Sequence, residues 1–286
     1  MNYVITHYTG NLRQPGIRSF VHSLGCVDAQ VIFFTSNSEV PDFMRTDQIR
    51  VVVTPDRRCV TPNFQRHFDT LDFLEAEKPE GNFLVCDCRD LVFLGDPFSP
   101  ILINNSIEHL KAIPKDPHAT RAVSNRLHVF QECGLYRNRD EFCNKVWLEA
   151  LHPTVLDRLG HHIVLCGGTI MGESLESLLA YHKAHLSVVN RYSPTTEGAR
   201  FNDQATFNET IRSGLTNIET VVHHNEAPSL VYTLGNVPHD EYSIGDDNLI
   251  WVNGFSPPVI HQYDRRDRAY GLIRKLFPYW PDWPLP

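Results

Sequence analysis

Apolar and polar positions in the first hundred residues follow two different periods. Short apolar runs are typical of buried strands, and longer segments carry apolar side chains at helical spacing. Strands that alternate with helices predict a largely parallel sheet with helical crossovers. The predicted strands are 2–6, 29–35, 49–53 and 82–86, and the predicted helices are 14–24 and 63–76.

Beyond residue 100 the same alternation continues less regularly. The segment 162–165 leads into Gly167–Thr169, which predicts a tight turn before a helix at 173–188. The C-terminal stretch 271–286 is rich in aromatic residues and proline, which predicts an extended strap whose aromatic side chains pack on the core. The other predicted strands are 101–103, 128–131, 219–222, 230–233 and 249–252, and the other predicted helices are 139–151 and 203–211.

The fold class that this pattern predicts is α/β, with a Rossmann-type, mostly parallel sheet flanked by helices. We find no internal repeat, low-complexity segment or linker, so residues 1–286 are expected to form a single domain.

Composition narrows the class of protein. With 42% hydrophobic residues the chain can bury a large core, and its apolar runs are too short for a membrane span or a signal peptide. A net charge of −8 argues against nucleic acid as a partner. Seven cysteines without a CxxC pair favour reduced thiols in the cytoplasm.

The stretch FLVCDCRDLVFLGDPF places charges between two apolar runs. Asp87 and Asp90 follow a predicted strand, and ligands of open α/β sheets bind at the carboxyl ends of strands. Two carboxylates there can hold a hard divalent cation. The alternative is a simple turn in which Arg89 pairs with both, and composition alone favours the turn.

Three further segments carry candidate chemistry, each weak alone. Val259 and Ile260 lead into His261, which can complete a metal site, and Arg265 or Arg266 can bind a phosphate. Gly167–Thr169 allows a ligand to approach the backbone closely. Asp203–Gln204 begins a predicted helix, where capping is an equally good explanation.

Together and in this order, these segments resemble the GT-A-fold glycosyltransferases that use nucleotide-sugar donors. DCRDLVFLGDPF is similar to the DxD segment of that family. Counting back from Asp96, Asp90 falls on the second aspartate of the motif and Cys88 on the first, so Asp87 is displaced by one residue. Which of Asp87 and Asp90 binds the metal directly stays open.

The resemblance implies a role for each segment. Asp87, Asp90 and His261 would bind Mn²⁺ or Mg²⁺, and Asp203 with Gln204 would face the donor sugar and the acceptor as catalytic residues. Residues 1–100 would be the nucleotide-binding half, and 101–270 the acceptor and catalytic half. The donor-binding residues would be Thr6, His7 and Tyr8 for base and ribose, Arg66 and Arg265 for the diphosphate, and Gly167, Gly168 and Thr169 beside the sugar.

The implied activity is transfer of a sugar from a nucleoside-diphosphate sugar to a glycan or another acceptor hydroxyl. The metal would stabilise the leaving diphosphate, and a retaining reaction is slightly favoured over an inverting one. We expect a cytoplasmic enzyme, with peripheral membrane contact left open. The sequence does not predict the sugar, the base, the acceptor or the oligomeric state.

Two other interpretations use the same residues. A metal-dependent nucleotidyltransferase or phosphohydrolase would also need Asp87, Asp90 and His261, but it would act without a sugar acceptor. The displaced aspartate also allows a nucleotide-sugar-binding module with a degenerate catalytic site.

Overall fold

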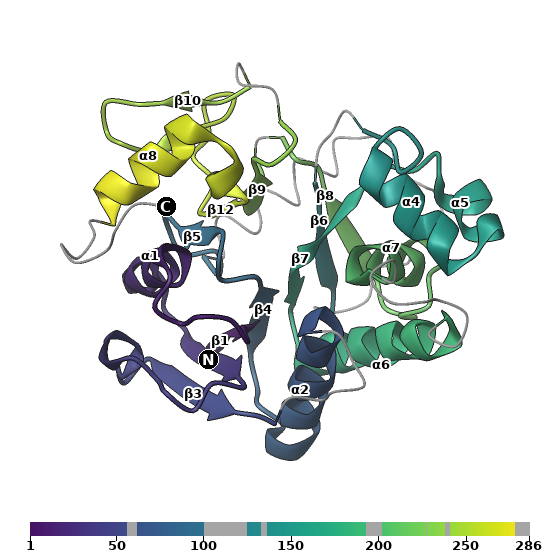
Figure 1. The fold of residues 1–286 in the computed structure, drawn as a ribbon, viewed down its shortest axis with the longest axis horizontal. Helices are drawn as coiled ribbons and strands as arrows, with labels where there is room; N and C mark the ends of the chain where they lie inside the picture. Colours follow the sequence, from purple (N-terminus) through teal and green to yellow (C-terminus); the bar gives the residue numbers. More distant parts are fainter. Residues whose placement is uncertain are drawn as a thin grey trace.

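A computed structural model describes residues 1–55, 62–99, 125–132, 136–192, 202–226, 228–237 and 241–277 (Figure 1). It has a mixed α/β architecture with a mostly parallel central sheet, helices on both faces of the sheet and a smaller sheet at one side. This confirms the α/β class and the mostly parallel sheet that the sequence predicts. No helix in these ranges is long and apolar enough to cross a lipid bilayer.

Seven strands of the described chain form the central sheet, in the order β3-β2-β1-β4-β7-β6-β8. Neighbouring strands are parallel except around β7, which runs antiparallel to both β4 and β6. The carboxyl ends of β1, β4 and β6 therefore lie at one edge, beside the first residues of β7. The strands are β1 Asn2–His7, β2 Gln30–Thr35, β3 Ile49–Val53, β4 Asn82–Cys86, β6 Leu127–Gln131, β7 Leu165–Gly172 and β8 Thr220–His223.

Both faces of the sheet are buried. Successive strand residues point to opposite sides, and each side packs into its own hydrophobic cluster. Leu84 of β4 belongs to the hydrophobic cluster that contains Phe20 of α1, whereas Phe83 belongs to the cluster that contains Leu74 of α2. Helices α6 and α7 contribute to the second cluster, and α4 with α5 lies outside them (Figure 1). The helices are α1 Pro15–Ser23, α2 Pro62–Glu77, α4 Phe142–Leu151, α5 Pro153–Leu159, α6 Leu175–Tyr192, α7 Asp203–Arg212 and α8 Asp267–Leu276.

The smaller sheet brings a late segment of the chain against an early one. Its strands are β5 Leu91–Phe93, β12 Val259–His261 and β9 Val231–Thr233, with β12 in the middle. Helix α8 packs on it in Figure 1, and a short hairpin follows β9, made of β10 Ser243–Ile244 and β11 Ile250–Trp251. The antiparallel pairing of β12 with β5 sets His261 opposite Leu91.

Most predicted elements are confirmed within a few residues, but the turn predicted at Gly167–Thr169 is wrong. These residues lie inside β7, where Thr169 pairs with Cys86 of β4. Glycine has a low intrinsic preference for strands, so only pairing on both sides reveals the strand. Strands β5 and β10 and helices α5 and α8 were not predicted. Residues 271–276 of the predicted strap lie in α8, so the expected extended conformation is wrong there, because the prolines that exclude a helix begin only at Pro278. The predicted strand 101–103, and Tyr279, Trp280 and Trp283 of the strap, lie outside the described residues.

Candidate functional site

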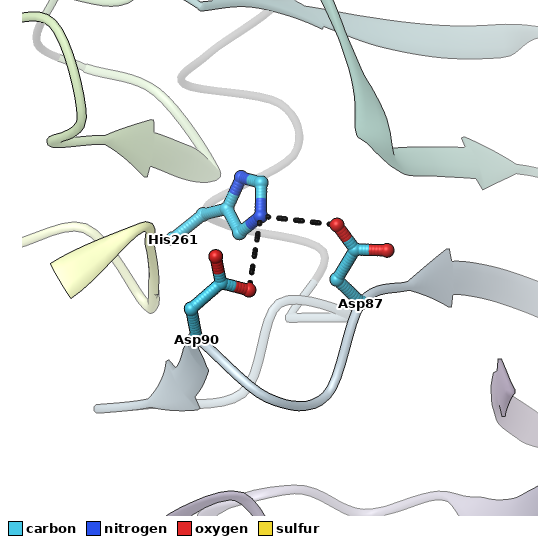
Figure 2. Close-up of side chains that lie close together, drawn as sticks. All are labelled: Asp87, Asp90 and His261. Atoms are coloured by element: carbon cyan, nitrogen blue, oxygen red, sulfur yellow. Dashed lines mark ion pairs between the residues drawn. The ribbon is translucent and has the colours of Figure 1, made fainter. Parts of the chain in front are cut away.

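Two aspartates and a histidine from three strand ends meet at the carboxyl edge of the central sheet. Asp87 follows β4, Asp90 precedes β5 and His261 ends β12. The Nε2 atom of His261 lies 3.5 Å from Oδ2 of Asp87 and 3.6 Å from Oδ1 of Asp90 (Figure 2). One ligand atom from each residue lies within 4.8 Å of the others.

Backbone hydrogen bonds fix the loop that carries both aspartates. The N–H of Asp87 donates to the carbonyl of Gly168 at 2.8 Å, and the N–H of Gln262 donates to the carbonyl of Asp90 at 2.7 Å. Cys88 lies in the hydrophobic cluster under the loop. The loop therefore turns Asp87, and not Cys88, toward His261.

These three residues fit a divalent cation. The Nε2 atom of His261 is buried and has no hydrogen-bond partner among the described residues, although two carboxylates lie just beyond hydrogen-bonding distance. Neighbouring ligands of an octahedral ion with bonds of about 2.1 Å lie about 3 Å apart, and opposite ligands about 4.2 Å apart. The observed 3.5 and 3.6 Å fall between these limits. Carboxylate oxygens favour Mg²⁺ or Mn²⁺, whereas an imidazole nitrogen is more typical of ions such as Zn²⁺ or Fe²⁺.

The charges in this group stabilise one another. Burial alone would raise the pKa of the Asp90 carboxyl, but His261 and Arg89 outweigh burial and lower that pKa. Burial alone would lower the pKa of His261, but Cys166 and the two carboxylates raise that pKa well above its ordinary value. A metal bound at Nε2 would displace this proton, because a ligating imidazole is neutral. The second ring nitrogen, Nδ1, lies 3.3 Å from Sγ of Cys166, so a contact behind the ring sets its orientation.

The two arginines near the aspartates have different partners. Arg89 lies 3.5 Å from Asp90 and 3.7 Å from Asp264, so it does not pair with both aspartates as the turn alternative expects. Arg66 of α2 instead donates to Asp87 and to Asp203, each at 2.6 Å, and to the carbonyl of Gly167 at 2.8 Å. Its guanidinium is therefore largely occupied by protein groups.

The predicted catalytic pair is built into this network. Asp203 begins α7, and Asn202 caps the helix by accepting from the N–H of Gln204 at 2.7 Å. Burial raises the pKa of Asp203 even though Arg66 pairs with its carboxylate. The Gln204 side chain accepts from the N–H of Gly167 at 2.7 Å.

A pocket of about 370 Å³ opens beside these residues and contains most of the predicted site. A larger hollow of about 660 Å³ beside Gly81 lies at the start of β4, away from every predicted residue. Arg265 lines the smaller pocket, and with 45% of its side chain exposed it is the more accessible of the two arginines predicted for the diphosphate. The residues that line this pocket include Arg66, Asp87, Glu132, Glu141, Trp147, Gly167, Gly168, Asp203, Gln204, His261, Gln262 and Arg265.

Glu132 in this pocket was not predicted. It follows β6 directly, as Asp87 follows β4, so a polar residue after a buried strand was the available signal. Gln204 donates to one carboxylate oxygen at 2.6 Å, and Gln262 donates to the other at 3.2 Å.

Three predicted base and ribose contacts at the end of β1 do not line the pocket. Thr6 is buried and donates to the carbonyl of Cys86 at 2.8 Å, and His7 lies 3.3 Å from the Asp69 carboxylate. Tyr8 is partly buried and packs on the core. Thr169 is buried, with Gly167 and Gly168 beside it lining the pocket. The roles given to Thr6, His7, Tyr8 and Thr169 stay predictions.

Comparison with known proteins adds no family to this geometry: no protein-family model matches the chain, and no curated protein matches it.

Proposed function

We propose that this protein is a metal-dependent glycosyltransferase of the GT-A type, which moves a sugar from a nucleoside-diphosphate sugar to an acceptor hydroxyl. The observation that carries the proposal is the convergence of Asp87, Asp90 and His261 at the carboxyl edge of the sheet, next to a polar pocket. A divalent cation held there would stabilise charge on the leaving diphosphate.

Other side chains of the pocket are placed to contact the diphosphate and to hold the aspartates in position. Arg265 is the more accessible of the two arginines that line the pocket among the described residues, so it is the candidate for contact with the diphosphate. Arg66 holds Asp87 and Asp203 in place and therefore acts on the site through its neighbours. Asp203 is paired with Arg66, and this ion pair holds the first turn of α7 in place. Asp203 would contact a substrate only if the substrate displaced the pair.

We also propose that the protein acts in a reducing compartment such as the cytoplasm. The cysteines of the described ranges, Cys26, Cys86, Cys88, Cys143 and Cys166, are all free thiols, which supports this location.

The test is turnover of nucleotide sugars. The purified protein is incubated with Mn²⁺ and the glucose, galactose and mannose conjugates of uridine, guanosine, adenosine, cytidine and thymidine diphosphates. Released nucleoside diphosphate and free or transferred sugar are then measured. We expect one base to support release, and Asp90→Asn to reduce it by about 100-fold or more while the fold is retained.

Asp246→Asn is the control, because it removes the same charge from an exposed position away from the site. Release of inorganic phosphate or nucleoside monophosphate would support the phosphohydrolase or nucleotidyltransferase alternative. Equal turnover in Asp90→Asn and wild-type protein would refute the proposed metal site.

A further inference from the structure

Glu132 is a carboxylate of the pocket to which the proposed chemistry gives no role. Only 7% of the Glu132 side chain is exposed, and its backbone is fixed on two sides. Its N–H donates to the carbonyl of Val164 at 3.0 Å, and its carbonyl accepts from the Asn225 amide at 3.2 Å. A buried carboxylate is costly unless hydrogen bonds or charges compensate it.

The compensation for Glu132 comes mainly from neutral amides. Gln204 donates at 2.6 Å and Gln262 at 3.2 Å, whereas the guanidinium of Arg265 lies 4.0 Å away. An ionised carboxylate can accept about four hydrogen bonds. Two amide donors therefore orient both oxygens of Glu132 and leave acceptor capacity in a residue that lines the pocket.

The backbone around these amides is adapted to hold them. Gln262 has a φ of 56°, which is a left-handed conformation that a residue with a side chain seldom adopts. A Cβ on Gly235 would overlap the Gln262 side-chain amide, and a Cβ on Gly167 would lie 3.2 Å from Oε1 of Gln204. Strained conformations of this kind persist where surrounding structure fixes them, frequently at ligand sites.

The other carboxylates that line the pocket are engaged elsewhere. Asp87 faces His261 and Arg66, and Asp203 pairs with Arg66. Glu141 caps α4 by accepting from the N–H of Asn144 at 2.6 Å. Among the described pocket carboxylates, Glu132 is therefore the one that neither forms a close ion pair nor caps a helix.

We infer that Glu132 is a specificity-determining residue of this pocket, whose carboxylate accepts hydrogen bonds from hydroxyl groups of the bound sugar. Sugar hydroxyls are donors that a carboxylate binds well, and Gln204 and Gln262 hold that carboxylate in one orientation. Trp147 also lines the pocket and offers an apolar ring surface of the kind that packs on a sugar face. This inference rests on the proposed function, because it requires a nucleotide sugar in the pocket.

The test compares two dissociation constants in one protein. Isothermal titration with Mn²⁺ gives the affinity for each bare nucleoside diphosphate and for its glucose, galactose and mannose conjugates. For wild-type protein we expect at least one conjugate to bind more tightly than the bare diphosphate. We call the ratio of the dissociation constant of the bare diphosphate to that of its sugar conjugate the affinity gain. In Glu132→Gln this gain should fall about tenfold or more, because a charged acceptor is lost.

Glu149→Gln is the matched control, because Glu149 is exposed on α4 and does not line the pocket. Its gain should equal that of wild type. If Glu132→Gln does not fold by circular dichroism, Glu132→Asp keeps the charge and withdraws the oxygens, and the same loss is expected.

Each other outcome overturns the inference. A gain that is unchanged in Glu132→Gln, or a sugar that adds no affinity in wild type, refutes the role of Glu132 and leaves the metal and diphosphate site standing. Failure of every nucleoside diphosphate to bind wild-type protein with Mn²⁺ refutes the proposed function together with the inference.

Discussion

Gly168 lies where the reversed strand β7 passes Asp87 and His261. A Cβ at this position would lie 2.5 Å from Oδ2 of Asp87 and 2.6 Å from Cε1 of His261, closer than real Cβ contacts allow. The absence of a side chain at residue 168 therefore lets Asp87 and His261 approach each other.

Replacement of Gly168 by alanine should weaken Mn²⁺ binding by about tenfold or more, since Asp87 or His261 must move. Displacing these groups should also cost about 1–3 kcal/mol of stability. Titration calorimetry with Mn²⁺ and urea unfolding measure the two effects. Unchanged Mn²⁺ affinity in Gly168→Ala would show that Asp87 and His261 do not hold the metal together.

Gly271 provides the matched control within α8. Nothing lies within 4 Å of a Cβ built there, and no unusual φ is involved. Gly271→Ala should therefore keep Mn²⁺ affinity and raise stability by about 0.5–1 kcal/mol, because alanine is the better helix former.

Arg66 joins two carboxylates that come from distant parts of the chain. Only 12% of its side chain is exposed, and burial would lower its pKa, but Asp203 and Asp87 raise it. Removal of a buried cation leaves carboxylates without their partner.

We expect Arg66→Met to lower the free energy of unfolding by about 3–5 kcal/mol in urea at pH 7. Adding Asp203→Asn should restore part of the loss, because it removes one uncompensated charge. Arg50→Met is the control, since the Arg50–Glu77 pair is about half exposed and should cost about 1 kcal/mol or less. Equal losses for both arginines would contradict the central position of Arg66.

At the scale of elements, α2 and α6 meet through three buried histidines. The rings of His67 and His185 lie with centroids 4.0 Å apart, and Nδ1 of His67 lies 3.3 Å from Nδ1 of His182. Burial lowers the pKa of all three imidazoles, to about 3 for His182. The helix interface therefore requires neutral histidines.

This interface should make stability depend on pH in mildly acidic solution. The unfolded chain binds protons at these histidines below about pH 6.5, and the folded chain does not, so stability falls as the pH is lowered. Each such histidine contributes up to about 1.4 kcal/mol per pH unit. In His182→Asn, the free energy of unfolding measured in urea should fall less steeply between pH 6 and 5 than in wild type. The difference in slope should correspond to about one proton. An unchanged slope would mean that His182 is protonated in the folded state.

At the scale of the whole molecule, the alternation of apolar runs was enough to predict most of the central sheet. Strands such as β2 and β4 are buried on both sides, so they appear as continuous apolar segments. The short strand β5 could not be recognised, because its partner β12 follows about 170 residues later. The strand character of Gly167 and Gly168 likewise depends on pairing with distant strands.

The proximity of the three candidate ligands was predictable because Asp87, Asp90 and His261 each adjoin an apolar strand, and the structure places them close together. Their role as metal ligands stays a prediction. Glu132 has the same local pattern, but its importance comes from Gln204 and Gln262, whose approach only the folded chain reveals.

The most direct test of a metal-dependent donor site is the thermal unfolding midpoint with UDP, GDP, CDP, ADP or dTDP, each with Mn²⁺ or EDTA. A ligand that binds only the folded state raises the midpoint. We predict a rise for one diphosphate with Mn²⁺ that disappears with EDTA and in Asp90→Asn. No rise with any diphosphate, or a rise that persists unchanged in Asp90→Asn, would contradict a metal-dependent donor site at Asp87, Asp90 and His261.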